Sequence, residues 1–260
     1  VPLINVNNGF TNRGGIVIFT QNATNQLVFD SFHPMATGCG QDVAIGDVHG
    51  TADNDIIVGC PLSTGVENGV RDGVLQVHDG PGFSGGFSGT VRLVVDPFNA
   101  LLTEDRHLGM DFEVGYVTND SKADIVATTE FHHGGEADRK VLRYNLLVSE
   151  DAVVEGTLPL EESNGSPFSF HTTLLNIDRN AFVDVVIGHP NGVRVFLGSA
   201  TGLSQTQEVS RPTGTPVTSV TTAAGDFDGD GDDDLALGNE GDDAYNGDQP
   251  GEVLVYKNNN

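Results

Sequence analysis

A short acidic pattern that recurs along the chain constrains its fold more than any other feature. Its clearest copy runs from Gly225 to Gly238 and reads Gly-Asp-Phe-Asp-Gly-Asp-Gly-Asp-Asp-Asp-Leu-Ala-Leu-Gly. Carboxylates at alternate positions repel one another unless a hard cation lies among them, and Ca²⁺ is the usual ion. Gly229 and Gly231 permit the tight backbone that brings the oxygens together. The stretch therefore predicts a calcium-binding loop.

The main alternative for this stretch is the calcium loop of a helix–loop–helix protein. That loop needs a bidentate acid at its twelfth position and a helix on each side. Counted from Asp226, the twelfth position is Leu237, and residues 251–256 read as a strand. We therefore expect a loop that is closed by its ninth residue, Asp234, and that lies between two strands.

The same pattern occurs at three earlier places. Aligned on the closing aspartate, the copies are the first loop (47–55), the second loop (116–124), the third loop (176–184) and the fourth loop (226–234). Short runs of Val, Ile and Leu surround each copy, and Gly, Asn and Asp separate these runs. No segment shows sustained helical periodicity, so the sequence predicts an all-β protein.

The spacing of these copies suggests a repeated four-stranded unit, which is typical of a β-propeller. We expect a single propeller domain over residues 1–260, with repeat units at about 1–35, 36–96, 105–160, 168–210 and 217–257. The two terminal units look incomplete, with about three strands each. A compact ring of about five blades is the favoured interpretation. The chain could also be part of a larger propeller, or subunits could exchange strands, since open sheet edges invite pairing.

The repeated unit consists of an apolar residue, Gly-Asp, the acidic loop, Asp, three apolar residues and Gly, followed by Gly-x-Val-x-Val. This unit resembles the FG-GAP repeat. That repeat builds the β-propellers of integrin alpha chains and of related bacterial and fungal proteins. The resemblance covers essentially the whole chain and is strongest in the fourth loop. It implies that each loop joins the first two strands of a blade. It also implies that Ca²⁺ is held by the side chains at positions 1, 3, 5 and 9 and by the carbonyl of position 7.

The resemblance implies a set of calcium ligands in three loops. In the fourth loop they are Asp226, Asp228, Asp230 and Asp234, with the carbonyl of Asp232. In the third loop they are Asn176, Asp178, Asn180 and Asp184, with the carbonyl of Phe182. In the first loop the matching positions are Asp47, His49, Thr51 and Asp55, with Asp53 at the carbonyl position 7. In this family the ion usually stiffens the loop, so a structural role is expected. A closing aspartate can also act as a turn cap that accepts hydrogen bonds from backbone amides.

Two loops depart from the family pattern. His49 stands at position 3 of the first loop and is a poor calcium ligand, so that site is expected to be weak. In the second loop Tyr116 replaces the first acid and Lys122 places a cation at position 7. We expect weak or no calcium binding there, with hydrogen bonds holding the loop.

The charge of the chain limits its partners. Thirty-seven acidic residues face 12 basic ones, for a net charge of −25. Nucleic acids and anionic membranes repel such a surface, so neither is expected as a partner. No apolar run reaches the roughly 18 residues of a membrane-spanning helix. The chain begins at Val1 without a signal-peptide pattern, which suggests a processed or trimmed protein.

Cysteines and glycosylation motifs bear on the compartment. Cys39 and Cys60 flank the hairpin around the first loop and could form a disulfide or remain two buried thiols. Asn-x-Ser/Thr motifs begin at Asn22, Asn119 and Asn164. They are compatible with a secreted glycoprotein.

Two other motifs could indicate catalysis. Residues 82–86 match the Gly-x-Ser-x-Gly nucleophile pattern, but no helix follows, so a flexible loop is the simpler interpretation. Glu130, His132 and His133 could bind a transition metal or perform acid–base chemistry, although such loops are usually only solvated.

Three functions compete. The first is a secreted or cell-surface calcium-binding propeller that acts as an adhesion module for a protein or a carbohydrate, as the resemblance to integrin heads and fungal lectins implies. The lack of Trp and the presence of only four Tyr favour a protein partner over a sugar. The second is a propeller-fold polysaccharide lyase or hydrolase, and the third is a structural subunit of a larger extracellular assembly or homo-oligomer. An enzyme is the less expected outcome.

Overall fold

A computed structural model describes most of the chain. The described residues are 2–3, 13–62, 73–80, 91–94, 108–129, 138–145, 153–161, 171–189, 192–210, 220–239 and 251–258. Every regular element in these ranges is a β-strand, which confirms the predicted all-β class. Within the same ranges there is no helix with the length and apolarity that a bilayer crossing requires.

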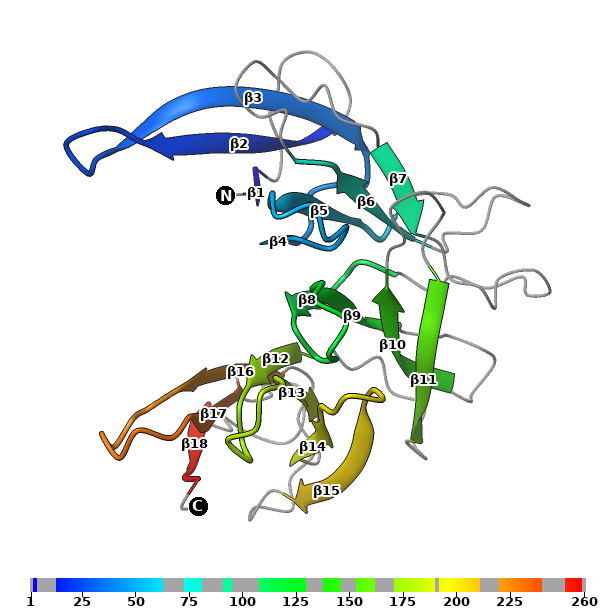
Figure 1. The fold of residues 1–260 in the computed structure, drawn as a ribbon, viewed down its shortest axis with the longest axis vertical. Coiled ribbons are helices and arrows are strands. Elements are labelled where there is room, and N and C mark those ends of the chain that lie inside the picture. The colour runs from blue at the N-terminus through cyan, green and yellow to red at the C-terminus, as the bar shows by residue number, and fades with distance from the viewer. Residues whose placement is uncertain are drawn as a thin grey trace.

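The strands form five small antiparallel sheets in chain order, in which each strand pairs with its sequence neighbours (Figure 1). The first sheet holds β1 (Pro2–Leu3), β2 (Arg13–Gln21) and β3 (Leu27–Thr37). The second holds β4 (Val43–Gly46), β5 (Asp55–Cys60), β6 (Val74–His78) and β7 (Val91–Val94). The third holds β8 (Phe112–Gly115), β9 (Asp124–Thr129), β10 (Asp138–Asn145) and β11 (Val153–Glu161). The fourth holds β12 (His171–Leu175), β13 (Asp184–His189), β14 (Gly192–Leu197) and β15 (Ser204–Ser210). The last holds β16 (Val220–Gly225), β17 (Asp234–Asn239) and β18 (Glu252–Tyr256).

Among the described strands, the terminal sheets have three each and the inner sheets have four, as the sequence predicts. The first strands β4, β8, β12 and β16 contact one another in series, so the sheets follow an arc. Figure 1 places the first sheet at one end of the molecule and the last sheet towards the other. The described residues therefore show a row of blade-like sheets, and the closed five-bladed ring stays a prediction.

The core lies between neighbouring sheets, which pack face to face. In β5, Ile56 and Val58 pack towards the first sheet, while Ile57 packs towards the third. Successive side chains of a strand point to opposite faces, so a strand that is covered on both faces is apolar at every position. The same alternation recurs in β9 and β13, where the residues are Ile125, Val126, Ala127, Val185, Val186 and Ile187.

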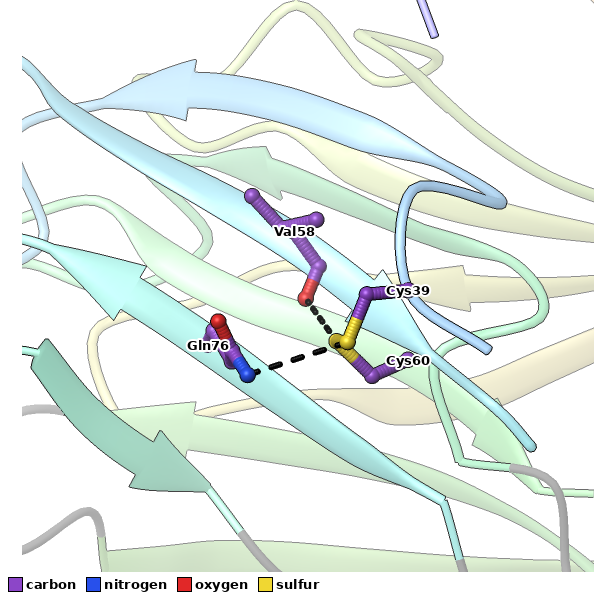
Figure 2. Close-up of a disulfide and its surroundings, with 4 residues drawn as sticks. All are labelled: Cys39, Val58, Cys60 and Gln76. Carbon is purple, nitrogen blue, oxygen red and sulfur yellow. Dashed lines mark hydrogen bonds between the residues drawn. A yellow bond between two sulfur atoms is a disulfide. The ribbon is translucent and has the colours of Figure 1, made fainter. Parts of the chain in front are cut away.

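A disulfide joins Cys39 to Cys60 and ties the end of the first sheet to the second sheet (Figure 2). Cys39 follows β3 and Cys60 ends β5. Gln76 Nε2 donates to Cys39 Sγ at 3.7 Å from the neighbouring strand β6. Of the two states that the sequence allows for these cysteines, the structure has the bonded one.

Candidate metal-binding loops

The four acidic loops occupy the same place in four successive sheets. Each joins the first strand of its sheet to the second, as the resemblance implies. The closing aspartate is the first residue of the second strand and is at most 1% exposed in every copy. The first strands contact one another in series, so the four loops lie in a row along one side of the arc.

The closing aspartates hold their loops through backbone amides. In three loops the Oδ2 atom accepts the amide of position 2, from Val48 at 3.0 Å, Ile177 at 2.6 Å and Phe227 at 3.1 Å. The other oxygen accepts an amide just beyond the third strand, from Gly80 at 2.8 Å, Gly198 at 2.9 Å and Asn258 at 2.8 Å. One carboxylate thus joins the loop, the second strand and the end of the third strand. The closing aspartate is therefore a turn cap, and it also binds the end of the third strand, a contact that the sequence did not indicate.

The fourth loop brings three carboxylates together. Ligand oxygens of Asp226, Asp228 and Asp234 all lie within 4.8 Å of one another. Asp226 accepts the amides of Gly229 at 2.6 Å, Asp230 at 3.1 Å and Gly231 at 3.0 Å, so the backbone wraps around it. The two glycines have φ of 81° and 93° and open space where a Cβ would stand. Glycine is therefore needed at these two positions because of their positive φ, and not because a side chain would clash.

Two basic side chains partly neutralise this loop. Lys257 Nζ lies 3.0 Å from Asp228 Oδ2, and this hydrogen bond lowers the pKa of Asp228 and raises the pKa of Lys257. Arg179 of the third loop pairs with both oxygens of Asp232, which is only 4% exposed. The Asp232 side chain is thus committed to an arginine, and the role of its carbonyl as a calcium ligand stays a prediction. Asp230 accepts the amide of Asp232 at 3.0 Å and is outside the three-carboxylate cluster.

The third loop leaves one buried oxygen unsatisfied. Asn176 Oδ1 is buried without a hydrogen-bond partner among the described residues, while Asn176 Nδ2 donates to the carbonyl of Asn180 at 2.8 Å. Asn180 Oδ1 accepts the amide of Phe182 at 2.6 Å, and Asp178 accepts from the backbone and side chain of Asn180. An unpaired buried oxygen is costly, and an oxygen-seeking cation would satisfy it. The donor set therefore fits Ca²⁺.

The first loop gathers a different set of groups. His49 Nδ1 lies 3.0 Å from Asp55 Oδ2, and Nε2 lies 3.3 Å from Asp79 Oδ1. Burial alone would raise the pKa of Asp55, but the hydrogen bonds from His49 and from backbone amides outweigh it, so this pKa is lowered. Asp47 accepts the amides of Thr51 and Ala52 instead, at 2.9 and 2.8 Å.

Of the two carboxylates predicted as ligands in the first loop, Asp55 belongs to the cluster with His49 and Asp79, and Asp47 does not. Asp47 is committed to its own turn, and the role of the Asp53 carbonyl stays a prediction. Sequence reasoning did not single out Asp79, which directly follows β6. A repeat alignment of third-strand ends could have indicated it, because the neighbouring Gly80 aligns with Gly198 and Asn258.

Neighbouring loops are hydrogen-bonded to one another. Position 8 of the second loop, Ala123, donates its amide to the carbonyl of Asp47 at position 1 of the first loop, at 2.9 Å. Val183 repeats this bond to Tyr116 at 3.0 Å, between the third and second loops. Between the third and fourth loops, the Asn176 amide donates to Asp233 Oδ2 at 3.4 Å, and Asn258 Nδ2, just after β18, donates to the carbonyl of Ile177 at 2.9 Å. The loops thus form one continuous row.

The second loop has no cluster of metal-binding groups among the described residues. Its closing aspartate, Asp124, accepts both the amide and the hydroxyl of Thr118 at 3.1 Å. Lys122 donates its amide to Asp120 at 3.1 Å, and its side chain lies against Gly50 of the first loop. Hydrogen bonds hold this loop, as expected from its sequence.

A second group of acids lies where the first strands begin, away from the acidic loops. Asp42 accepts the amide of Phe112 at 3.3 Å, and Asp111 accepts the amide of Thr172 at 2.7 Å. Each acid thereby ties its own sheet to the next. Burial raises the pKa of Asp111 to about 6 and, together with nearby carboxylates, the pKa of Glu113 to about 7. No sequence motif indicated these residues.

The two other motifs from the sequence lie outside the described residues. They are the Gly-x-Ser-x-Gly stretch at 82–86 and the group of Glu130, His132 and His133. Both stay predictions.

Comparison with known proteins bears on the C-terminal part of the chain. Residues 176–237 match the family model of the FG-GAP-like repeat, and residues 220–256 match that of the FG-GAP repeat. No curated protein matches the chain at a significant level. The matched residues contain the third loop with the strand that follows it, and the fourth loop with the strands on both sides. The chain therefore carries FG-GAP repeats in its C-terminal half.

Proposed function

We propose that this protein is a calcium-stabilised interaction module of the FG-GAP propeller type that acts outside the cell. The observation that carries the proposal is the convergence of Asp226, Asp228 and Asp234 within a matched FG-GAP repeat, with their oxygens within 4.8 Å of one another. Three carboxylates so close together repel one another, and a bound divalent cation turns this repulsion into attraction.

Calcium suits the site because every donor is an oxygen. Ca²⁺ takes six to eight oxygen ligands in flexible geometry, so carboxylates, backbone carbonyls and water can complete the shell. The buried Asn176 Oδ1 supports a second ion in the third loop. Both loops lie in one hydrogen-bonded row, so the ions would stiffen that side of the arc and leave ligand binding to another surface.

The proposed location rests on the disulfide and on the repeat family. A disulfide between Cys39 and Cys60 persists in an oxidising environment and is reduced in most cytosols. The contacts of β4, β8, β12 and β16 in series support a propeller-type arrangement. The partner is a protein or a carbohydrate, and the absence of Trp favours a protein. The net charge of −25 disfavours nucleic acid and insertion into anionic membranes.

Thermal unfolding with calcium and with EDTA tests the role of the ion. Ca²⁺ that binds only the folded state adds about 2.7 kcal/mol at a hundredfold excess over its dissociation constant. We expect the wild-type Tm to rise with calcium, and Asp226→Asn with Asp228→Asn to lose most of that rise. Asp30→Asn is the matched control, because it removes a charge on β3, outside the loops. Identical wild-type melting curves in calcium and EDTA would exclude a calcium-stabilised scaffold.

Binding and cleavage assays test the role as an interaction module. A glycan array and immobilised extracellular proteins should show binding without turnover. Clear cleavage of acidic polysaccharides in a lyase assay, with no stable binding, would favour the enzymatic alternative instead.

A further inference from the structure

We propose that this chain associates head to tail, with the outer face of the last sheet of one copy packed on the outer face of the first sheet of another. The inference does not depend on calcium, because both faces lie on strands and not on the acidic loops. It rests on positions that are equivalent in successive sheets, and the inner sheets show what each position normally contacts.

The inner sheets show which residues face the following sheet. Two places after the closing aspartate stand Ile57 in β5 and Val186 in β13, both fully buried. Opposite them on the third strand are Val77 and Val195, which pack in the same intersheet clusters. Val193, two residues before Val195, is 1% exposed. These positions are buried because another sheet covers them.

The last sheet has the same arrangement of apolar residues, but they are exposed. Ala236 stands two places after Asp234 and pairs with Val255, and Gly238 pairs with Val253. Val253 is 70% exposed and Val255 is 52% exposed, whereas the equivalent Val193 and Val195 are 1% and 8% exposed. The opposite face of this sheet, with Leu235 and Leu237, packs against the fourth sheet. The exposed face therefore has the chemistry of a surface that receives a following sheet.

The first sheet exposes the opposite kind of face, the one that a preceding sheet would cover. In β2, Ile16 and Ile18 pack towards the second sheet, so the alternate residues Val17 and Phe19 face outwards. Phe32 and Phe29 stand opposite these two residues in β3. The rings of Phe19 and Phe29 form an edge-to-face pair at 6.3 Å. The phenylalanines of this outer face are exposed by 46% (Phe19), 62% (Phe29) and 40% (Phe32).

A second copy is the occupant that fits both faces. The first and last sheets lie at opposite ends of the arc, so the two faces of one chain do not meet (Figure 1). The two faces are complementary. In the inner sheets, a face of the last-sheet kind is covered by the following sheet, and a face of the first-sheet kind is covered by the preceding sheet. The contact is heterologous, so repetition closes a ring or extends a filament. Because the net charge of −25 opposes self-association, added salt should strengthen it.

Two blocking substitutions test the proposal together. Phe29→Asp blocks the first-sheet face, and Val253→Asp blocks the last-sheet face. Burial of a carboxylate in an apolar contact costs well over 1.4 kcal/mol, so each should raise the dissociation constant by at least about tenfold. Ile45→Asp is the control, because Ile45 is 63% exposed on β4 and belongs to neither face. Sedimentation velocity over a range of concentrations and salt gives the masses.

The mixture of the two variants gives the decisive result. We expect concentration-dependent assembly of the wild type and of Ile45→Asp, and monomers of each blocked variant alone. An equimolar mixture should form one-to-one heterodimers, because one intact face of each kind remains. Far-ultraviolet circular dichroism checks folding, and Phe32→Asp or Val255→Asp replaces a variant that does not fold. A monomeric wild type, which ring closure within one chain would give, overturns the proposal. Assembly that neither substitution weakens also overturns it, and so does a mixture that stays monomeric.

Discussion

Arg179 in the third loop and Asp232 in the fourth form a two-point ion pair between adjacent sheets. Arg179 Nε and one terminal nitrogen each donate to a different oxygen of Asp232. The arginine side chain is 55% exposed, whereas the aspartate side chain is 4% exposed. The hydrogen bonds to Asp232 raise the pKa of Arg179 further. Two repeats that the sequence presents as separate loops are therefore one electrostatic unit.

Removal of Arg179 should destabilise the protein more than removal of both partners. Arg179→Ala leaves the nearly buried Asp232 without a counter-charge, whereas Arg179→Ala with Asp232→Asn leaves no charge to compensate. We expect the single variant to have the lower free energy of unfolding in urea. Both are measured in EDTA so that calcium does not contribute. Asp232→Asn alone completes the double-mutant cycle, and additive effects of the two substitutions would show that the two side chains are not coupled.

Asp184 should be important for stability even without calcium. Its carboxylate is buried and accepts the amides of Ile177 and Gly198. Asp184→Ala leaves two amides without their acceptor, so the free energy of unfolding in EDTA should fall by about 2–4 kcal/mol. Asp178→Ala, at an exposed position of the same loop, is the control and should change it by less than about 0.5 kcal/mol. A similar loss of stability in both variants would contradict the turn-cap role of Asp184.

Glu113 and Asp111 should make the protein less stable as the pH rises. The pKa of Glu113 is raised from 4.5 to about 7 and that of Asp111 from 3.8 to about 6, with burial as the main cause. As the pH rises, the unfolded chain releases these protons before the folded protein does. Between the unfolded and the folded pKa values, the folded state therefore binds more protons. The stabilising contribution is therefore complete below about pH 4 and is lost as the pH approaches 7.

Glu113→Gln should flatten this slope. Without the carboxyl group, the variant should be more stable than the wild type at pH 8 by about 1–2 kcal/mol, a value reduced for the partial solvent exposure of the site. At pH 4.5 the two should be nearly equal. Urea unfolding at both values measures the difference, with Asp30→Asn as the control. A wild type that gains stability relative to Glu113→Gln as the pH rises would contradict the assignment.

The disulfide should contribute to stability through the loop that it closes. Cys39 and Cys60 are separated by 21 positions, and a crosslink over a loop of this size stabilises by about 3 kcal/mol. Cys39→Ala with Cys60→Ala should lower the free energy of unfolding by about that amount. Dithiothreitol should lower the Tm of the wild type and leave that of the double variant unchanged. Equal sensitivity of both proteins to the reductant would argue against the bond.

Much of the fold follows from local patterns in the sequence. In β5, β9 and β13, a run of apolar residues after an aspartate predicts a strand that is covered on both faces. The acidic loops are predicted because alternate Asp residues with Gly229 and Gly231 allow only a few backbone conformations. Three strands in each terminal sheet also follow from counting apolar runs. These features depend on residues that lie close together in the sequence, so the sequence alone determines them.

The tertiary structure alone decided which distant residues meet. It placed His49 between Asp55 and Asp79 and turned the Asp47 carboxylate to its own loop, so Asp79 and not Asp47 joins Asp55 and His49. It also paired Arg179 with Asp232, bonded the two cysteines, and left Val253 exposed where the inner sheets bury its equivalents. The physical reason is that each of these contacts depends on how one sheet packs on the next. Strand periodicity and loop chemistry specify each sheet, but they do not specify that packing.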